Sequence, residues 1–417
     1  MAEPVSNIRI NSDRLWDMLM DMAKIGPGVA GGNNRQALTD ADADGRQLFA
    51  DWCHAEGLTM DVDELGNMFM TRPGQNNDLP PILVGSHLDT QPTGGKYDGV
   101  LGVLAGLELI RTLNDHDYQT QHPICIVNWT NEEGTRFAPA MLSSGVFAKE
   151  YDKAWAYSRE DSDGLTFGDE LERIGWKGDQ PIGEKTFDSY FELHIEQGPI
   201  LELEDKDIGV VAKAQGLCWL KFTITGNAAH TGSTPMSARK DAGLAMARII
   251  NQVNAIVTEE GQDAVGAVGH MQITPNSYNV IPGWAQFTVD FRAPQEDSIK
   301  RMVEHIQDYA KQLCANSGLG LEMERISGHN PVVFDADCTH LVRQAADELG
   351  YRHRDMVSGA GHDACWLNKV MPSTMIFCPC KDGLSHNEAE DITPEWAAAG
   401  SNVLLHAVLK RAKLVTD

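Results

Sequence analysis

Residues 81–113, PILVGSHLDTQPTGGKYDGVLGVLAGLELIRTL, decide the fold of this chain. The first four form a short continuous apolar run, which is typical of a strand buried on both faces of a sheet. Residues 100–113 form a helical apolar stretch. Glycines within residues 94–99 allow the tight turn between the two. Strand, loop and helix in this order are the repeating unit of parallel α/β sheets.

The same alternation continues on both sides of this stretch. Further strands or helices are predicted at residues 39–57, 68–72, 124–129, 375–377 and 394–413, and in a helix that ends near Gly350. We therefore expect an α/β fold with a mostly parallel sheet and flanking helices. Residues 1–213 and 331–417 are expected to form this catalytic, metal-binding domain.

Residues 214–330 interrupt the α/β pattern. Residues 219–225 alternate like a half-buried strand, and the order that follows is helix, strand, strand, helix, strand. The whole order, β-α-β-β-α-β, is that of a ferredoxin-like unit. The sequence therefore predicts a smaller α+β domain inserted into the catalytic domain.

The composition excludes several classes of partner. Of the 417 residues, 34 are Lys or Arg and 60 are Asp or Glu, which gives a net charge of -26. Such a surface repels phosphate backbones and anionic lipids, so neither a nucleic acid nor a membrane is expected as a partner. The N-terminus lacks the pattern of a signal peptide, and the eight cysteines include no C-x-x-C pair. A reducing cytoplasm is the expected location.

Polar residues that can bind a ligand follow the first apolar strand. His87 and Asp89 come directly after it, and Asp98 lies in the glycine-rich turn that precedes the helix. Ligands of open α/β sheets collect at the carboxyl ends of strands. Taken alone, however, a histidine and an aspartate at a strand end are more often a hydrogen-bonded pair than metal ligands.

Three more segments place similar residues at strand ends. Glu132 and Glu133 end the apolar run 124–129, and adjacent carboxylates there repel each other unless a cation or a proton compensates them; a solvated turn is the equal alternative. His194 shares a face with Glu196 on an extended stretch. His386 lies in a glycine-containing turn just after residues 375–377.

Together these segments predict a metal site. Its candidate ligands are three imidazoles and two carboxylates without a thiolate: His87, Asp98, Glu133, His194 and His386. This donor set suits two catalytic ions of Zn²⁺, Mn²⁺ or Co²⁺ better than a structural zinc. Glu132, next to a ligand yet itself free, is then the natural general base.

Six motifs carry a family resemblance: SHLDTQPTGGKYDG, NEEGTRF, ELHIEQGP, AAHTGSTPMSARKDA, SGAGHDA and GLSHNEAE. In this order and spacing they resemble the dinuclear-metal amidase branch of the M20 metallopeptidase-like superfamily. That branch contains N-carbamoyl-L-amino-acid hydrolases, β-ureidopropionases and allantoate amidohydrolases. The resemblance runs from about residue 40 to residue 400.

The resemblance implies a role for each motif residue in the catalytic domain. It implies that Asp98 bridges the two ions, that Asp89 orients His87, and that Glu132 is the base and proton shuttle. Gln197 and His362, which lie in the matching HIEQ and GHD motifs, are implied to line the substrate pocket.

The resemblance also implies that the inserted domain is a lid and a dimerisation module. His230 would reach the partner subunit's site and polarise the scissile carbonyl, while Asn279 and Arg292 would bind the substrate carboxylate. Without the family, His230 is only a turn histidine and Arg292 a solvated surface charge. A guanidinium nevertheless suits a carboxylate ligand, because it binds that group in bidentate fashion.

These inferences predict a homodimeric metalloenzyme that hydrolyses the carbamoyl amide of an N-carbamoyl amino acid. Its products would be the amino acid, CO₂ and ammonia. Allantoate amidohydrolase is the nearest alternative, and an aminoacylase or peptidase is less favoured. A non-catalytic relative would lack the base or a ligand, and this sequence has all of them.

Overall fold

The computed structural model describes residues 7–261 and 263–415. The chain divides into two compact units. The first unit comprises Met1–Ala212 and Phe334–Asp417, and the second comprises Lys213–Val333. Within the described residues, no helix combines the length and the apolar character needed to cross a membrane.

The first unit is built on a sheet of nine strands with a parallel centre. Strands β3 (Ile82–His87) and β5 (Ser189–Ile195) lie in the middle, with β4 (Ile124–Trp129) beside β3 and β15 (Ser373–Cys378) beside β5. These four strands are all parallel. The outer strands are β2 (Met68–Arg72) and β1 (Thr59–Val62) beyond β4, and β6 (Ile208–Ala214), β13 (Val332–Val333) and β14 (His353–Ser358) beyond β15. The predicted mostly parallel sheet is thus confirmed for its central strands.

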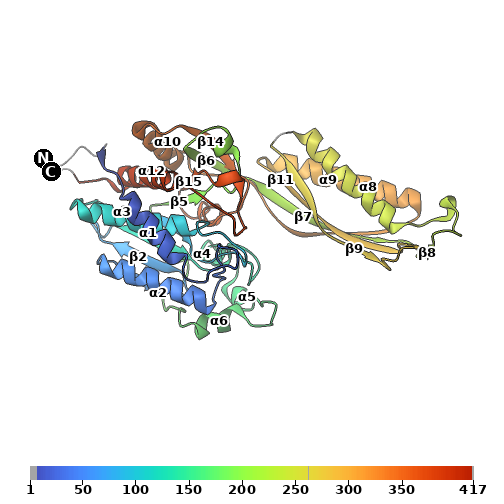
Figure 1. Cartoon of the computed structure of the whole chain (residues 1–417), viewed down its shortest axis with the longest axis horizontal. Helices are drawn as coiled ribbons and strands as arrows, with labels where there is room; N and C mark the ends of the chain where they lie inside the picture. Colours follow the sequence, from blue (N-terminus) through green and yellow to red (C-terminus); the bar gives the residue numbers. More distant parts are fainter. Residues whose placement is uncertain (1–6, 262, 416–417) are drawn as a thin grey trace. The chain divides into compact units, whose positions relative to one another are not determined.

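Helices flank this sheet, as predicted (Figure 1). Helix α3 (Val100–Asp115) and helix α12 (Pro394–Ala412) pack directly against the central strands β3, β5 and β15. Around them lie α1 (Ser12–Met22), α10 (Ala336–Leu349) and α2 (Asp40–Ala55). Several helices begin where a side chain can accept a main-chain N–H: Thr39 caps α2 in this way, and Thr393 caps α12.

Shorter helices lie between β4 and β5, between β5 and β6, and after β14. They are α4 (Leu142–Phe147), α5 (Lys153–Tyr157), α6 (Phe167–Arg173), α7 (Ile200–Leu203) and α11 (Asp363–Leu367). Leu142, Phe167 and Leu171 belong to a small apolar core of their own.

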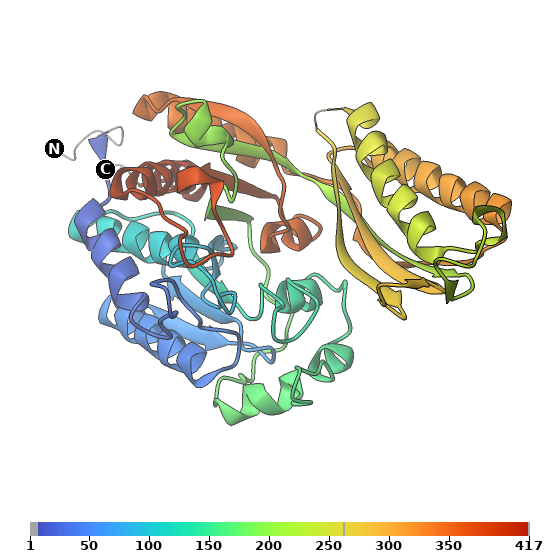
Figure 2. The same cartoon turned by 45° about the vertical axis from the view of Figure 1, so that its right-hand side comes forward.

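The second unit is a four-stranded antiparallel sheet with two helices packed on it (Figure 2). The strands lie in the order β12 (Gly320–His329), β7 (Gly216–Thr225), β11 (Trp284–Ala293) and β9 (Val265–Thr274). The helices are α8 (Ala242–Glu260) and α9 (Glu296–Ser317). The predicted β-α-β-β-α-β order is therefore present, with one addition: a two-stranded antiparallel sheet of β8 (Ala229–His230) and β10 (Val280–Ile281).

The parallel centre of the first unit determines where its polar residues meet. His87 is the last residue of β3 and pairs in register with Trp129, the last residue of β4. His194, near the end of β5, pairs with Phe377 near the end of β15. Because parallel strands end at the same edge of a sheet, the segments that follow them converge there.

Candidate functional site

Two groups of side chains at this edge could each hold a metal ion. One contains His87, Asp98 and His194, and the other contains Asp98, Glu133 and His386. Within each group the donor atoms lie within 4.8 Å of one another. The structure thus brings together all five residues that the sequence proposes as ligands, and Asp98 belongs to both groups.

Asp98 faces the two groups with different oxygens. Its Oδ1 atom lies 3.1 Å from Nε2 of His194 and 3.7 Å from Nε2 of His87. Its Oδ2 atom lies 3.6 Å from Nε2 of His386, which in turn lies 3.4 Å from Oε2 of Glu133. This is the arrangement that a carboxylate bridging two cations requires.

Main-chain carbonyls orient the two buried imidazoles. The Nδ1 atom of His87 lies 2.9 Å from the main-chain oxygen of Asp89, and that of His194 lies 2.9 Å from the main-chain oxygen of Ile195. A carbonyl only accepts a hydrogen bond, so each Nδ1 carries a proton and each Nε2 is directed toward Asp98. Histidines that bind metal ions are oriented in this way.

The pKa shifts of Asp98 and His194 reflect the need of the buried Asp98 carboxylate for positive charge. Burial lowers the pKa of His87 to about 4. Burial acts in the same direction on His194, but the Asp98 carboxylate outweighs it and raises the pKa of this imidazole to about 9. At Asp98 the effect of burial is outweighed by His194, His87 and His386, which hold the pKa of the carboxyl well below its usual range. A divalent cation satisfies the same need, and the nitrogen and oxygen donors fit one in each group.

Glu132 lies beside the candidate ligands but in neither group. Its Oε2 atom is 3.5 Å from Nε2 of His87. Burial, reinforced by nearby carboxylates such as Asp363, raises the pKa of Glu132 well above its ordinary value. Glu133 is also buried, and Nε2 of Gln91 donates a hydrogen bond of 2.6 Å to its Oε2 atom. Glu132 therefore has the position and the environment of a proton acceptor.

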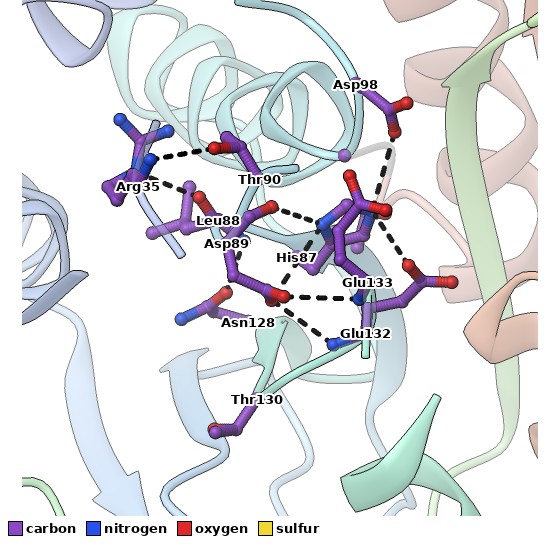
Figure 3. A network of polar contacts seen from close by, with 12 residues as sticks. Arg35, His87, Leu88, Asp89, Thr90, Asp98, Asn128, Thr130, Glu132 and Glu133 are labelled. Carbon is purple, nitrogen blue, oxygen red and sulfur yellow. Dashed lines mark hydrogen bonds and ion pairs between the residues drawn. The ribbon is translucent and has the colours of Figure 1, made fainter. Parts of the chain in front are cut away.

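Asp89 contacts both sides of the site (Figure 3). Its carboxylate accepts hydrogen bonds from the main-chain N–H groups of Glu132, at 3.3 Å, and Glu133, at 3.2 Å. Its Oδ1 atom is 4.0 Å from Nδ1 of His87, so the orienting contact to that imidazole comes from the main-chain oxygen instead. The Asp89 carboxylate thus holds the turn that carries the two glutamates, and burial raises its pKa to about 7.

The loop after β3 is itself held by buried polar side chains (Figure 3). Nε of Arg35 donates to the main-chain oxygen of Leu88, and the main-chain N–H of Arg35 donates to Oγ1 of Thr90. Oδ1 of Asn128, on β4, accepts the main-chain N–H of Leu88. These bonds fix the backbone on both sides of Asp89.

The two predicted pocket residues of the first unit lie against the cluster. Nε2 of Gln197 donates to Oδ2 of Asp98 at 2.8 Å. The ring of His362 is buried and lies 4.5 Å from that of His194, centroid to centroid. Ser385 also donates to Oδ2 of Asp98, at 2.8 Å.

Sequence reasoning missed Ser385 and Gln91. Ser385 precedes His386 within the quoted motif GLSHNEAE, and Gln91 follows Asp89 by two residues. Their proximity to candidate ligands was the available signal.

His230 and Asn279 lie together in the second unit. The Nδ1 atom of His230 accepts the main-chain N–H groups of Gly232 and Ser233, both at 3.1 Å. The proton of a neutral His230 is therefore on Nε2, and the side chain is exposed. The N–H of Thr231 donates to the main-chain oxygen of Asn279, so the two predicted residues are neighbours.

Arg292 lies at the other end of the same sheet. It pairs with Leu217 near the start of β7, whereas β10, which follows Asn279 and pairs with His230 of β8, adjoins the Trp284 end of β11. At about 3.3 Å per residue, the length of β11 separates these two places by roughly 26 Å. The guanidinium contacts Asp290, with Nη2 2.9 Å from Oδ2. The structure therefore brings His230 and Asn279 together but not Arg292.

Comparison with known proteins assigns the family. Residues 83–410 match the family described as Peptidase family M20/M25/M40. The chain belongs to this M20 family. Its membership confirms the resemblance carried by the six motifs.

Relatives within the M20 family include named hydrolases. An N-carbamoyl-L-amino-acid amidohydrolase of Rhizobium meliloti is 59% identical over 415 residues, which cover 100% of each chain. A ureidoglycolate hydrolase of Oryza sativa subsp. japonica is 33% identical over 410 residues, 96% of this chain and 85% of that protein. A crystal structure of an amidase of the hydantoinase/carbamoylase family from Burkholderia multivorans has a TM-score of 0.93 at 53% identity, covering 97% of this chain and 98% of that one.

Proposed function

We propose that this chain hydrolyses the carbamoyl C–N bond of an N-carbamoyl-L-amino acid to the amino acid, CO₂ and ammonia. One observation carries the proposal. Two groups of side chains that could each hold a metal ion share Asp98, and Glu132 lies beside them without belonging to either. The chain that contains them matches the Rhizobium meliloti amidohydrolase over its full length. Metal-assisted hydrolysis of an amide uses a cation that polarises the carbonyl and a base that takes a proton from the attacking water.

The cofactor we propose is a pair of Zn²⁺, Mn²⁺ or Co²⁺ ions. His87 and His194 would hold one ion, Glu133 and His386 the other, and Asp98 both. Bound there, such ions lower the pKa of water and polarise the substrate carbonyl. The absence of thiolates and the directed Nε2 atoms support this assignment.

We assign the proton transfers to Glu132. A carboxylate beside the reacting atoms accepts a proton from the attacking water and delivers it to the leaving nitrogen. The hydrogen bonds from the turn to Asp89 hold the main chain of Glu132 in place beside the cluster.

We propose that the enzyme is a homodimer whose active sites contain residues of both subunits. A small ureido acid cannot span the roughly 26 Å between the two ends of β11, so one subunit cannot offer it both His230 and Arg292. We infer that the substrate meets Arg292 of its own subunit and the partner subunit's His230, with the partner's Asn279 beside it. Strand β9 supports pairing between copies, because it is an edge strand that exposes Val265 and Met271.

The substrate carboxylate is the group we assign to Arg292. The guanidinium contacts a carboxylate, that of Asp290, and a planar guanidinium binds such groups well, which supports this assignment. The partner subunit's His230 would donate from Nε2 to the carbonyl oxygen as negative charge develops there.

Allantoate amidohydrolase is the alternative, because it acts on another ureido acid with the same groups. A relative named ureidoglycolate hydrolase supports it at lower identity. We also propose a cytoplasmic location, since all eight cysteines are free and buried.

A panel of substrates tests the proposal. Ammonia release would be measured with several N-carbamoyl-L-amino acids, N-carbamoyl-β-alanine, allantoate and ureidoglycolate. We expect the highest kcat/KM on an N-carbamoyl-L-amino acid. Ammonia release from allantoate alone would select the alternative, and release from neither allantoate nor an N-carbamoyl amino acid would contradict both.

A further inference from the structure

His386 is the most exposed of the candidate ligands. Half of its side chain is accessible, whereas the other four are buried. It lies in the loop between β15 and α12, and its backbone is left-handed, with φ at 53°. A ligand in such a position needs external support to keep a fixed distance from Asp98. Two glutamates of the same loop, Glu388 and Glu390, belong to neither cation group.

Glu390 connects this loop to the main chain of Asp98. Its Oε1 atom accepts the N–H groups of Tyr97 and Asp98, both at 3.1 Å. The side chain is 4% exposed, so water does not compete for these bonds. One carboxylate on the His386 loop thus holds the backbone of the residue shared by both cation groups.

The close approach of Glu390 explains a glycine of the Asp98 loop. A Cβ atom on Gly95 would lie 2.0 Å from Cδ and Oε1 of Glu390. No side chain fits there while Glu390 keeps its position. Gly95 has no positive φ, so space and not backbone conformation excludes a larger residue.

Glu388 anchors the same loop on its outer side. Its Oε2 atom accepts the main-chain N–H groups of Ala30 and Gly32. The next residue, Asn33, exchanges two main-chain hydrogen bonds with Gly94, where the Asp98 loop begins. Residues 28–33, 94–98 and 385–390 therefore form one interlocked junction.

We propose that Glu390 is a positioning residue that sets the separation of Asp98 and His386, and thereby the affinity of the cation group formed by Asp98, Glu133 and His386. This inference rests on the proposed two-metal site. Glu390 acts through main-chain hydrogen bonds and touches no donor atom of that group. The group of His87, Asp98 and His194 depends on it less, because its two imidazoles belong to residues of the strands β3 and β5.

Stepwise metal binding tests this inference directly. Metal-free protein would be titrated with Co²⁺ and with Zn²⁺ against a chromophoric chelator, and bound metal counted by elemental analysis. We expect two ions in the wild type. The second ion is the one held by Asp98, Glu133 and His386. In Glu390→Ala it should bind at least about 10-fold more weakly, the loss typical when a residue that orients a metal ligand is removed. The first ion should bind nearly as in the wild type.

Two variants separate hydrogen bonding from charge and from general destabilisation. Glu390→Gln keeps an oxygen that accepts both N–H groups, so it should retain the second ion. Glu108→Ala removes another buried glutamate that accepts a main-chain N–H, that of Asn11, and that pairs with Arg14 rather than with a residue of the cluster. It should lower the melting temperature without changing either metal affinity.

A double-mutant cycle adds a test that a general folding defect cannot mimic. Gly95→Ala should weaken the second ion by displacing Glu390, and it should have little further effect in the Glu390→Ala background. Glu390→Asp, which withdraws the carboxylate by one methylene, replaces Glu390→Ala if that variant does not fold.

The outcomes separate the two proposals. Wild-type protein that binds fewer than two ions overturns the two-metal site and this inference with it. Wild-type protein that binds two ions, with both affinities unchanged in Glu390→Ala or Glu390→Asp, overturns only the role of Glu390. Equal losses in Glu390→Gln and Glu390→Ala also overturn it, because the acceptor oxygen would then be irrelevant.

Discussion

The two units differ in how closely their candidate site residues lie together. In the first unit, Asp98 lies within 3.7 Å of three imidazoles, and every candidate ligand belongs to a group. In the second unit, His230 and Asn279 are exposed, and they lie at the opposite end of β11 from Arg292. The first site is assembled by one chain. The candidate residues of the second unit are not gathered into one cluster in this way. We propose that Arg292 contacts the substrate and that His230 contacts the substrate of the other subunit.

Metal removal is the most severe test of the first unit. Chelation should abolish turnover, because the proposed ions polarise the substrate carbonyl and activate the attacking water. Adding Mn²⁺, Co²⁺ or Zn²⁺ back should restore it. Full activity in protein shown by elemental analysis to be metal-free would remove the metallohydrolase proposal.

Adjacent glutamates give a matched pair within the same unit. Glu132→Gln should lower kcat by about 10²- to 10⁴-fold, the usual contribution of general acid–base catalysis, with metal content unchanged. Glu133→Gln should instead reduce metal content, since Glu133 belongs to a cation group and Glu132 does not. Measuring both kcat and bound metal checks the contrast. If Glu132→Gln loses metal, or keeps a tenth of the wild-type kcat, the base must be reassigned.

The proposed role of the partner subunit's His230 gives the next largest effect. His230→Ala should lower kcat by about 10²- to 10³-fold, as removal of a hydrogen-bond donor to a developing oxyanion does. Mixing His230→Ala subunits with Glu132→Gln subunits should restore activity. Each mixed dimer then contains one site with an intact Glu132 and an intact partner histidine.

Verified mixed dimers that stay inactive would contradict the shared site. In that case His230 either acts in its own subunit or has no catalytic role. A chain that remains monomeric at assay concentrations, yet is fully active, would have the same consequence.

The sequence predicts the parallel centre and the cluster well, for a physical reason. Strands β3 and β4 contain continuous apolar runs, and His87 and Glu133 lie at or just beyond their ends, so local pattern and site position coincide there. The outer strands β6, β13 and β14 were not predicted. Strands β6 and β13 lie where the chain passes between units, and β14 pairs with β6, a segment far away in sequence.

Side-chain partners were harder to predict than positions. The Asp89 carboxylate bonds to N–H groups 43 and 44 residues away, which depends on how two loops meet. The Arg292–Asp290 pair is different: residues two apart on a strand share a face, so this contact was readable from the sequence.

Arg292 provides the mildest test, and it asks whether the second unit binds substrate at all. Arg292→Ala should raise KM roughly 10- to 100-fold with kcat nearly unchanged, because charged hydrogen bonds contribute about 1.5–3 kcal/mol and this one is made in both ground and transition states. Lys221→Ala removes the cation of another ion pair on the same sheet, that with Glu324, and should leave KM unaltered. Asp290→Asn should lower KM or leave it unchanged, since it removes the carboxylate that competes with substrate. If Arg292→Ala and Lys221→Ala behave alike, Arg292 serves only as the partner of Asp290, and the substrate carboxylate is bound elsewhere.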